Sequence, residues 1–561
     1  MSQIIPYRKD IEGLRAFAVL AVIFFHLGLL PNGYLGVDVF FVISGYLITS
    51  IINTEISAGT FSLRGFYLRR IRRILPMIFF VTLIVLVPGM LFMLPDDLEN
   101  LSQSVIATNF FGNNFLQLIT TGDYWDLANE YKPLMHTWSL GIEEQFYLIY
   151  PLLFLGLQRK KMHWILPVLI LVTVVSLGLL FLRTNQAYKF YLLPFRFFEL
   201  ATGGIMAVYP WKKNTSKSLA MLYVIALLLL LGVDSSLNTI VEIVLATAVT
   251  AGLLTCSGNN ILLENNIVVF LGKISFSLYL WHQVIIAYFR YAANDISYKN
   301  LLVIFPAILL ISALTYHFIE EPFRKKFKTR TLLITLFFLL SLSTGVAAYL
   351  YSREGVIRDV PELEIKKGNL QKNKFNQYTD AIFAFDKKFE NNGKIKVLVV
   401  GNSFARDWAN VLLESGYDID LSYSEKTRDI ANKASAASVI FVVGKHKADI
   451  PTKYLSKIWC IGSKKFGVSN GIFYNKKRDE KYCTMTTPLD KRIINENIKL
   501  QKEWGKQYIG IIEPVMNEKG EVPVFSDCKF ISYDCKHLTS NGAKYFATVL
   551  DKQLKSILIK K

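Results

Sequence analysis

The sequence predicts a polytopic α-helical membrane domain followed by a soluble three-layer α/β domain. Residues 11 to 350 contain repeated runs of about 17 to 22 apolar residues, the length needed to cross a hydrocarbon layer roughly 30 Å thick. Residues 352 to 561 contain no such run and have the length of an ordinary soluble domain. The chain therefore combines two classes of fold.

Eleven apolar runs are predicted to span the membrane. They cover 11–31, 34–54, 74–94, 139–157, 163–183, 190–210, 217–232, 239–256, 267–289, 300–319 and 331–350. The first ten fall within 1–330, and the eleventh, in 331–351, links them to a polar connector over 352–390. The first run has no small-residue cleavage site after it, so we expect it to be retained as a span.

Charged residues alternate between the loops. Basic residues follow the second and the tenth runs, whereas the long loop over 95–138 is acidic. Because Lys and Arg gather in cytoplasmic loops, the N-terminus is predicted to lie in the cytoplasm and residues 352–561 outside. This placement accounts for the net charge of +19 without nucleic acid, for which the sequence has no stacking or groove-reading motif.

The first run carries ionisable residues that are unusual in a membrane span. Glu12, Arg15 and His26 lie within it or at its ends. Arg15 and His26 are separated by nearly three helical turns and share one face about 16 Å apart, so one elongated ligand could contact both. The alternative is structural: Arg15 snorkels to the interface and His26 bonds a neighbouring helix.

Several sequence blocks, in this order, resemble the acyltransferase-3 family of membrane acyltransferases. The blocks cover residues 7–18, His26, 36–47, 66–76, 136–147, 272–282 and 320–324. The resemblance implies a ten-span domain that takes an acyl group, usually acetyl from cytoplasmic acetyl-CoA. It also implies delivery of that group to an extracytoplasmic sugar.

The resemblance assigns roles to the two residues of the first span. His26 matches the family's histidine, whose neutral imidazole can accept a proton near pH 7. Arg15 matches its arginine, which is always charged and suits a phosphate or carbonyl oxygen.

The family's Arg-x-x-Arg in the first cytoplasmic loop matches Arg69 and Arg72, or Arg70 and Arg73. Such a pair is expected to hold the phosphates of coenzyme A. The alternative is that these arginines only orient the protein in the membrane. Glu143 and Glu144, next to Trp138, are expected to support the site by orienting His26 or Arg15, with a structural ion pair as the alternative.

Other ionisable residues in the spans are predicted to be structural. They are Arg196 and Glu199, as an intrahelical pair, and His282 and His317, as core histidines.

The segment 391–561 begins with a strand that ends at a serine. The apolar run 395–400 leads into Gly401, Asn402 and Ser403, and an apolar-periodic helix follows near 404–414. Backbone N–H groups at such a helix start can stabilise an oxyanion. Further apolar runs at 438–443, 457–461 and 508–512 are expected to be buried strands.

The motif Asp-x-x-His, formed by Asp534 and His537, precedes a last helix that is expected to begin at Ser540. A serine after the first strand with Asp-x-x-His before the final helix resembles the SGNH hydrolase family. The resemblance makes Ser403 the nucleophile, His537 the base and Asp534 the orienting acid.

The segment departs from the family at two points. Asn402 stands where the family has aspartate, and the oxyanion donors are unclear, with Gly444 and Asn470 as candidates. A degenerate glycan-binding domain is the alternative.

Four of the five cysteines lie in this domain. In an oxidising compartment they suggest two disulfides. Proximity favours Cys528 with Cys535 and Cys460 with Cys483. No pair has CxxC spacing, and no metal is predicted.

The whole pattern predicts an O-acetyltransferase of a bacterial inner membrane, with a periplasmic C-terminal domain. Acetyl-CoA is the expected donor, and lipopolysaccharide O-antigen sugar is the first expected acceptor, with peptidoglycan as the second. A membrane-anchored glycan deacetylase would need the triad without Arg15 or His26, and a transporter would not need the triad.

Overall fold

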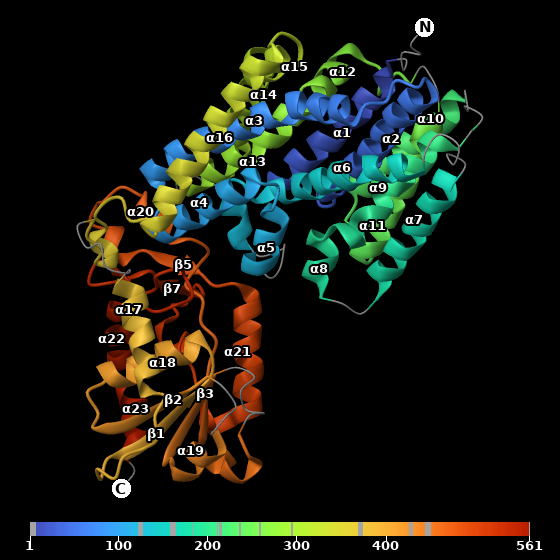
Figure 1. Ribbon diagram of the computed structural model, residues 1–561. Coiled ribbons are helices and arrows are strands. Elements are labelled where there is room, and N and C mark those ends of the chain that lie inside the picture. Colours follow the sequence, from blue (N-terminus) through green and yellow to red (C-terminus); the bar gives the residue numbers. More distant parts are fainter. Residues whose placement is uncertain are drawn as a thin grey trace. The chain divides into compact units, whose positions relative to one another are not determined.

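In a computed structural model of the protein, helices form most of the described residues before residue 351, and Figure 1 labels them. The structure describes residues 7–121, 127–157, 164–182, 185–209, 211, 216–234, 237–256, 260–292, 296–367, 374–425, 430–443 and 450–559. The chain divides into two compact units. We call Met1–Leu91 with Asn100–Tyr351 the helical unit, and Phe92–Glu99 with Ser352–Lys561 the α/β unit.

A helix, or a pair of consecutive helices, covers most of each apolar range predicted to span the membrane. These helices are α1 (Lys9–His26), α2 (Gly36–Ser57), α3 (Leu63–Phe92), α6 (Trp138–Leu157), α7 (Ile165–Phe181), α8 (Gln186–Tyr191), α9 (Leu193–Val208), α10 (Lys217–Gly232), α11 (Thr239–Thr255), α12 (Asn266–Lys273), α13 (Ser275–Tyr291), α14 (Tyr298–Thr315) and α16 (Thr329–Ser352). The short α15 (Glu321–Lys325) follows α14. Two helices that the sequence did not predict, α4 (Pro95–Asn109) and α5 (Asn113–Thr121), lie in the loop after α3.

Length and composition identify the helices that can cross a bilayer. Within the described ranges, 5 helical stretches pass both criteria, or up to 6 if α12 and α13, bent by 70°, form one span. The helices α7, α10 and α11 are apolar but shorter. A membrane protein with several spanning helices follows from this, and eleven spans stays a prediction.

Two glycines allow close packing inside the helical unit. A Cβ on Gly45 of α2 would lie 1.9 Å from the Leu200 carbonyl oxygen, and one on Gly203 of α9 would lie 2.0 Å from that of Val42. Small residues of this kind bring membrane helices into backbone contact, because lipid offers no hydrophobic drive for their association.

A buried ionic group joins the same two helices. Arg196 Nη1 lies 3.3 Å from Glu199 Oε1, which confirms the predicted intrahelical pair. Arg196 Nη2 also binds Asp38 Oδ1 of α2 at 2.7 Å. Both carboxylates therefore lie beside the one guanidinium inside the unit, and such pairing is the usual arrangement of ionisable residues within a membrane.

The α/β unit is built on a parallel sheet with the strand order β2-β1-β3-β4-β6. The strands are β1 (Ile395–Val400), β2 (Ile419–Ser424), β3 (Val439–Val443), β4 (Ile458–Ile461) and β6 (Tyr508–Ile509). Strand β1 pairs with both β2 and β3, in registers that set Val397 opposite Leu421 and Val439. Ser403 therefore follows a central strand, at the carboxyl edge where ligands of parallel sheets usually bind.

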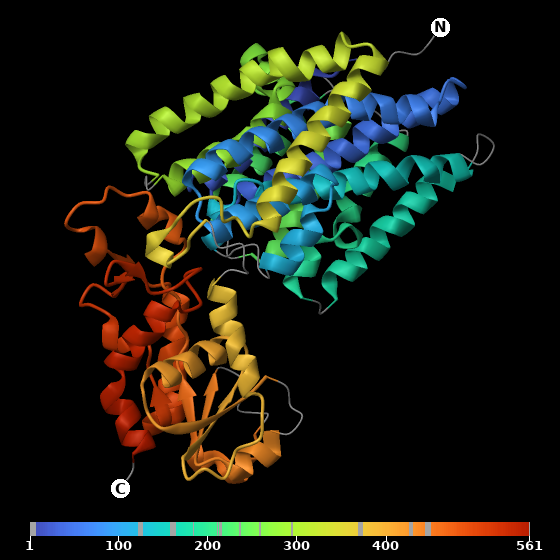
Figure 2. The ribbon, with the colours of Figure 1, turned by 60° about the vertical axis from the view of Figure 1, so that its left-hand side comes forward.

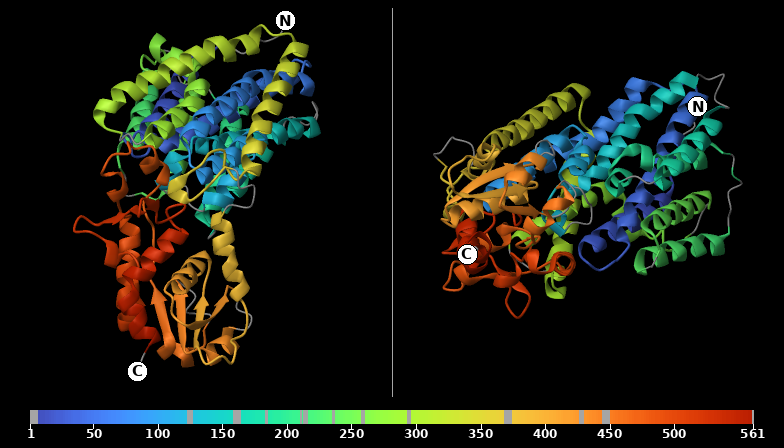
Figure 3. Two further views of the ribbon diagram at one scale, coloured as in Figure 1. Left: turned by 90° about the vertical axis from the view of Figure 1, so that its left-hand side faces the viewer. Right: turned by 90° about the horizontal axis from the view of Figure 1, so that it is seen from below.

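Helices cover both faces of this sheet. Val397 and Val399 pack against α18 (Ser403–Glu414), α22 (Ser540–Val549) and α23 (Asp551–Leu558). Leu398 and Val400 face the other way, toward α19 (Ile430–Ala436) and the end of α21 (Lys491–Trp504). Figures 2 and 3 show the orange strands side by side, with the red helices α22 and α23 along the sheet. The predicted α/β domain is confirmed as a parallel sheet with helices on both faces.

Smaller elements complete the α/β unit around this sheet. They are α17 (Lys374–Asp380), α20 (Asn470–Tyr474), β5 (Thr486–Pro488), β7 (Glu521–Pro523), β8 (Phe525–Ser526) and β9 (Lys529–Phe530). Strands β5 and β7 pair antiparallel, as do β8 and β9.

Residues 92–99 belong to the α/β unit although they come early in the chain. Arg358 Nη2 donates to the Met93 carbonyl at 2.6 Å, and Asn475 Nδ2 donates to the Phe92 carbonyl at 3.0 Å. A Cβ on Gly355, whose φ is +70°, would lie 1.9 Å from the Pro95 carbonyl oxygen. The segment is therefore packed closely within this unit.

Candidate functional site

Ser403 is the first residue of α18 and lies directly after the turn that leaves β1. Gly401 in this turn has φ +146°, a conformation that other residues rarely adopt. The Asn402 side chain caps the helix by accepting the Phe404 N–H at 3.0 Å. Asparagine at this position thus performs the capping that aspartate would also perform. The sharp turn leaves the Ser403 hydroxyl at the helix start.

The loop before α22 brings two partners to Ser403. His537 Nε2 lies 2.8 Å from Ser403 Oγ. His537 Nδ1 lies 2.7 Å from Asp534 Oδ2. The structure therefore brings the three residues predicted to form a triad into one chain of hydrogen bonds.

Asp534 is held in its charged form. Burial alone raises the pKa of Asp534, but hydrogen bonds from the His537 ring and from the N–H groups of His537 and Lys536 lower it to about 2. An ionised carboxylate only accepts hydrogen bonds, so the proton of His537 is on Nδ1. The Nε2 lone pair then faces the Ser403 hydroxyl and can accept its proton.

Of the two residues considered as oxyanion donors, neither is supported. Gly444 lies outside the described residues. Asn470 is buried, and its Nδ2 donates to the carbonyls of Ser532 at 2.7 Å and Tyr533 at 3.0 Å. Its amide hydrogens are therefore engaged, and Asn470 instead holds the backbone that leads into Asp534.

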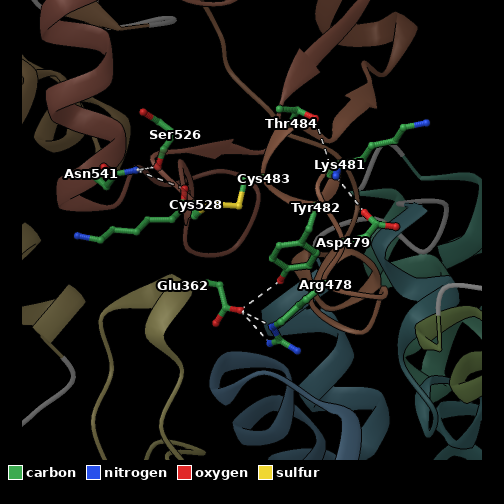
Figure 4. Close-up of a disulfide and its surroundings, with 11 residues drawn as sticks. Glu362, Arg478, Asp479, Lys481, Tyr482, Cys483, Thr484, Ser526, Cys528 and Asn541 are labelled. Atoms are coloured by element: carbon green, nitrogen blue, oxygen red, sulfur yellow. Dashed lines mark hydrogen bonds and ion pairs between the residues drawn. A yellow bond between two sulfur atoms is a disulfide. The ribbon is translucent and has the colours of Figure 1, made fainter.

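The disulfide pairing favoured by proximity is wrong. Cys483 is bonded to Cys528, 45 residues away in the sequence (Figure 4). Cys460 and Cys535 are buried, and neither takes part in a disulfide among the residues that the structure describes. Cys460 lies on β4 within the sheet core, and the Cys535 thiol lies 3.3 Å from Asn470 Oδ1. Tertiary packing thus separates residues that are near in the sequence.

A second candidate site is a cavity of about 90 Å³ inside the helical unit. Side chains from α1, α2, α3, α6 and α13 line it. Its charged members are Arg15, Arg70, Arg73 and Glu143. Three guanidinium groups beside one carboxylate make this a place for an anion.

The structure places the four arginines expected in a loop within helix α3, and Arg69 and Arg72 are engaged away from the cavity. Arg69 Nη2 lies 2.7 Å from Glu55 Oε1. Arg72 Nη1 donates to the Phe327 carbonyl at 2.7 Å, and its Nη2 donates to Thr329 Oγ1 at 3.0 Å. Of the two pairs that the sequence left open, Arg70 and Arg73 are the pair that lines the cavity.

The residues of α6 that were expected to support the site, Glu143, Glu144 and Trp138, lie in different surroundings. Glu143 lines the cavity and accepts hydrogen bonds from Ser44 and Tyr147, both at 3.0 Å. Glu144 Oε1 is buried and has no hydrogen-bond partner among the described residues. Trp138 packs against Phe190, with 4.4 Å between ring centroids. Arg15 pairs with Glu12 at 2.9 Å.

His26 ends α1 and lies in a group of histidines that the sequence had not connected with it. The His26 and His282 ring centroids are 5.3 Å apart, and those of His136 and His282 are 5.0 Å apart. The only sequence signal was that His136 and His282 open and close two of the quoted blocks.

Tyr279 links these histidines to the cavity. Its hydroxyl donates to the His136 carbonyl at 2.7 Å and lies 2.6 Å from Ser139 Oγ. Ser139 and Tyr279 both line the cavity. No group of His, Cys, Asp or Glu that could hold a metal ion occurs among the residues described by the structure.

Comparison with known proteins identifies the family. The model of an acyltransferase domain, that of the acyltransferase-3 family, matches residues 8–320, which is more than half of the chain. The chain belongs to this family of acyltransferases.

Three relatives with similar sequences are named as O-acetyltransferases. O-acetyltransferase OatA of Staphylococcus aureus strain NCTC 8325 is 32% identical over 355 residues, and OatA of strain COL has the same identity. The protein SAS0844 of strain MSSA476, whose name also contains the term O-acetyltransferase, is 31% identical over 350 residues. Each match covers 57% of this chain and 58% of the relative, so the chain matches less than two thirds of their length. No solved structure matches the chain.

Proposed function

We propose that this protein is a membrane O-acetyltransferase that moves acetyl groups from cytoplasmic acetyl-CoA to hydroxyl groups of an extracytoplasmic glycan. The observation that carries the proposal is the combination of an acyltransferase-3 domain with the hydrogen-bonded Ser403, His537 and Asp534. A deacetylase would need only the triad, and the arginine-lined cavity in the family domain favours a transferase that consumes a donor.

The donor site in this proposal is the cavity. Arg70 and Arg73 hold phosphate oxygens of coenzyme A, and Arg15 lies at the same cavity. Bidentate guanidinium contacts suit phosphates, and the buried position strengthens each of them. Acetyl-CoA supplies the activated acyl group. His26 acts as acid or base while the acetyl group passes through the helical unit.

The final transfer takes place at Ser403. Its Oγ forms a bond to the acetyl carbonyl carbon while His537 Nε2 takes the hydroxyl proton. The bond between the acetyl group and the group that delivers it then breaks, and that delivering group leaves with the proton. A glycan hydroxyl then attacks the acetyl-Ser403 ester, His537 takes its proton and returns it to Ser403, and the acetyl group stays on the sugar.

In our proposed topology the chain crosses a bacterial inner membrane eleven times, with the α/β unit in the periplasm. Two observations support this. Residues 92–99, which follow α3, pack in the same unit as residues 352–561, as expected if both lie on one side. The Cys483–Cys528 disulfide fits an oxidising compartment. The acceptor we propose first is lipopolysaccharide O-antigen sugar, and peptidoglycan is the second.

The test is the O-acetyl content of purified O-antigen and peptidoglycan, measured by NMR, from cells that express full-length variants at equal membrane levels. His26→Ala and Ser403→Ala are expected to lose the acetyl groups. Matched controls are His317→Ala, at an exposed imidazole, and Ser435→Ala, at an exposed hydroxyl of α19. Full acetylation in both test variants would refute the proposal. Whether the acetyl groups of the wild type are found on the purified O-antigen or on the purified peptidoglycan identifies the acceptor.

A further inference from the structure

A buried ion pair lies close to the triad of Ser403, His537 and Asp534. Asp407 follows Ser403 by one turn of α18, and Lys464 lies in the loop after β4. Lys464 Nζ donates to Asp407 Oδ2 at 2.6 Å, and the two side chains are 2% and 0% exposed. Burial raises the pKa of Asp407, while the charge of Lys464 opposes that shift. Removing two charges from water is costly, so such a pair calls for a specific role.

Each member of the pair contacts a residue adjacent to the triad. Asp407 Oδ2 accepts the N–H of Leu538, which directly follows His537, at 3.2 Å. Lys464 Nζ lies 3.9 Å from the centroid of the Phe404 ring. That ring packs against the His537 imidazole, with 5.4 Å between centroids. The pair thus contacts the backbone of the residue that follows His537 and the ring that packs against its imidazole.

The position of Lys464 is itself fixed by a third element. Asn497 of α21 accepts the Ser463 N–H at 2.8 Å and donates to the Ser463 carbonyl at 3.0 Å. This clamp holds the backbone next to Lys464. The ion pair therefore connects the start of α18, the loop that carries His537 and the segment after β4.

We propose that Asp407 and Lys464 are positioning residues that hold Ser403 and His537 at the distance needed for proton transfer. This inference rests on the proposed role of the triad. The pair touches no substrate and acts through Phe404 and Leu538. A small displacement of a reacting group has a large effect on rate, of about a hundredfold for 1 Å.

The probe is a fluorophosphonate, which bonds through phosphorus to an activated serine as fluoride and the hydroxyl proton leave. The full-length protein in detergent is labelled, and the rate at Ser403 is followed by mass spectrometry, beside thermal unfolding. The test variants are Asp407→Asn with Lys464→Met, and Asp407→Leu with Lys464→Met. Both remove the two charges together, because breaking one partner alone leaves an uncompensated buried charge.

Lys433→Met is the matched control. Lys433 is also buried in the α/β unit, where it pairs with Asp386 and donates to the Tyr423 carbonyl at 3.0 Å. Among the described residues, its hydrogen bonds go to Asp386 and to the Tyr423 carbonyl, and none goes to Phe404 or Leu538.

Both double variants are expected to unfold within a few degrees of the wild type and to label Ser403 about ten- to a hundredfold more slowly. The asparagine variant, which keeps an acceptor for Leu538, should be the faster one, and the control should label at the wild-type rate. Wild-type labelling in either folded double variant would overturn the inference. A wild type that is not labelled at Ser403 would instead refute the triad's proposed function.

Discussion

His537 Nε2 lies 2.8 Å from Ser403 Oγ although 134 residues separate the two in the chain. The contact exists because β1 ends at one edge of the sheet and the loop before α22 returns to that edge. Asp534 completes it by fixing the proton on the other ring nitrogen of His537. This arrangement makes the effect of Asp534 on both rate and stability open to measurement.

Asp534→Asn is expected to lower esterase activity toward p-nitrophenyl acetate by about three to four orders of magnitude, because asparagine permits the wrong histidine tautomer. The full-length protein in detergent is assayed beside Asp551→Asn, which changes a carboxylate on α23 that binds Tyr417. Equal loss in both variants would point to a general effect on folding.

The stability that Asp534 contributes should depend on pH. Its pKa is lowered from 3.8 to about 2 in the folded protein, so the contribution is fully present above about pH 4 and is lost as the pH falls toward 2. The shift corresponds to about 2 kcal/mol. Unfolding by denaturant at pH 7 and at pH 3 should therefore show a smaller difference between wild type and Asp534→Asn at the lower pH. A difference that grows on acidification would contradict this assignment.

The two pairs of arginines should behave differently. Arg70→Gln and Arg73→Gln are expected to raise the KM for acetyl-CoA about ten- to a hundredfold, because each loses a hydrogen bond between charged groups. Arg69→Gln and Arg72→Gln, which remove contacts to Glu55 and to the Phe327 carbonyl, serve as controls and should leave KM near the wild-type value. The assay uses radiolabelled acetyl-CoA with inside-out vesicles.

The disulfide predicts a pattern of thiol reactivity. After unfolding without reductant, an alkylating reagent should modify Cys256, Cys460 and Cys535 but not Cys483 or Cys528. Replacing both bonded cysteines by serine should lower stability by about 4 kcal/mol, as the entropy of a loop of 45 residues suggests. A mass spectrum in which Cys528 and Cys535 are protected from alkylation would instead support the pairing of Cys528 with Cys535 that proximity in the sequence favours.

A hydrogen bond to the backbone fixes the tautomer of the His282 ring in the helical unit. His282 Nδ1 lies 2.6 Å from the Tyr279 carbonyl, which only accepts, so this nitrogen carries the proton and Nε2 keeps its lone pair. His282→Asn retains a donor near Nδ1 and removes Nε2. We expect it to lower glycan O-acetylation at least tenfold, by analogy with the loss of one general base. His317→Asn is the control, and wild-type acetylation in His282→Asn would show that Nε2 is not used.

The sequence predicted where the long apolar helices lie, because long apolar runs have few alternatives to a helix in a membrane. How many of these helices cross the membrane stays a prediction. It missed α4 and α5, whose segments are too polar for that signal. It also missed β2, where Asp420 and Ser422 interrupt the apolar run. Sequence distance misled the disulfide assignment, because the loops that carry Cys483 and Cys528 meet only in the folded α/β unit.

The triad was accessible from the sequence because a serine after a strand and Asp-x-x-His before a helix each have a local signature. The choice among the arginines was not. Arg69, Arg70, Arg72 and Arg73 point around α3 at about 100° per residue, so only the packing of neighbouring helices decides which pair lines a cavity. Asp407 and Lys464 had no signature at all, since their roles depend on contacts across three segments.

The early segment 92–99 has a consequence for the exchange of parts between proteins of this kind. Because Met93, Pro95 and Phe92 pack against residues of the C-terminal region, a cut after Tyr351 would not release a complete module. A chimera that receives residues 352–561 without a matching 92–99 segment would leave Arg358 and Asn475 without their backbone acceptors. The two halves are therefore expected to be inherited and exchanged together, with the short early segment as the part that must match.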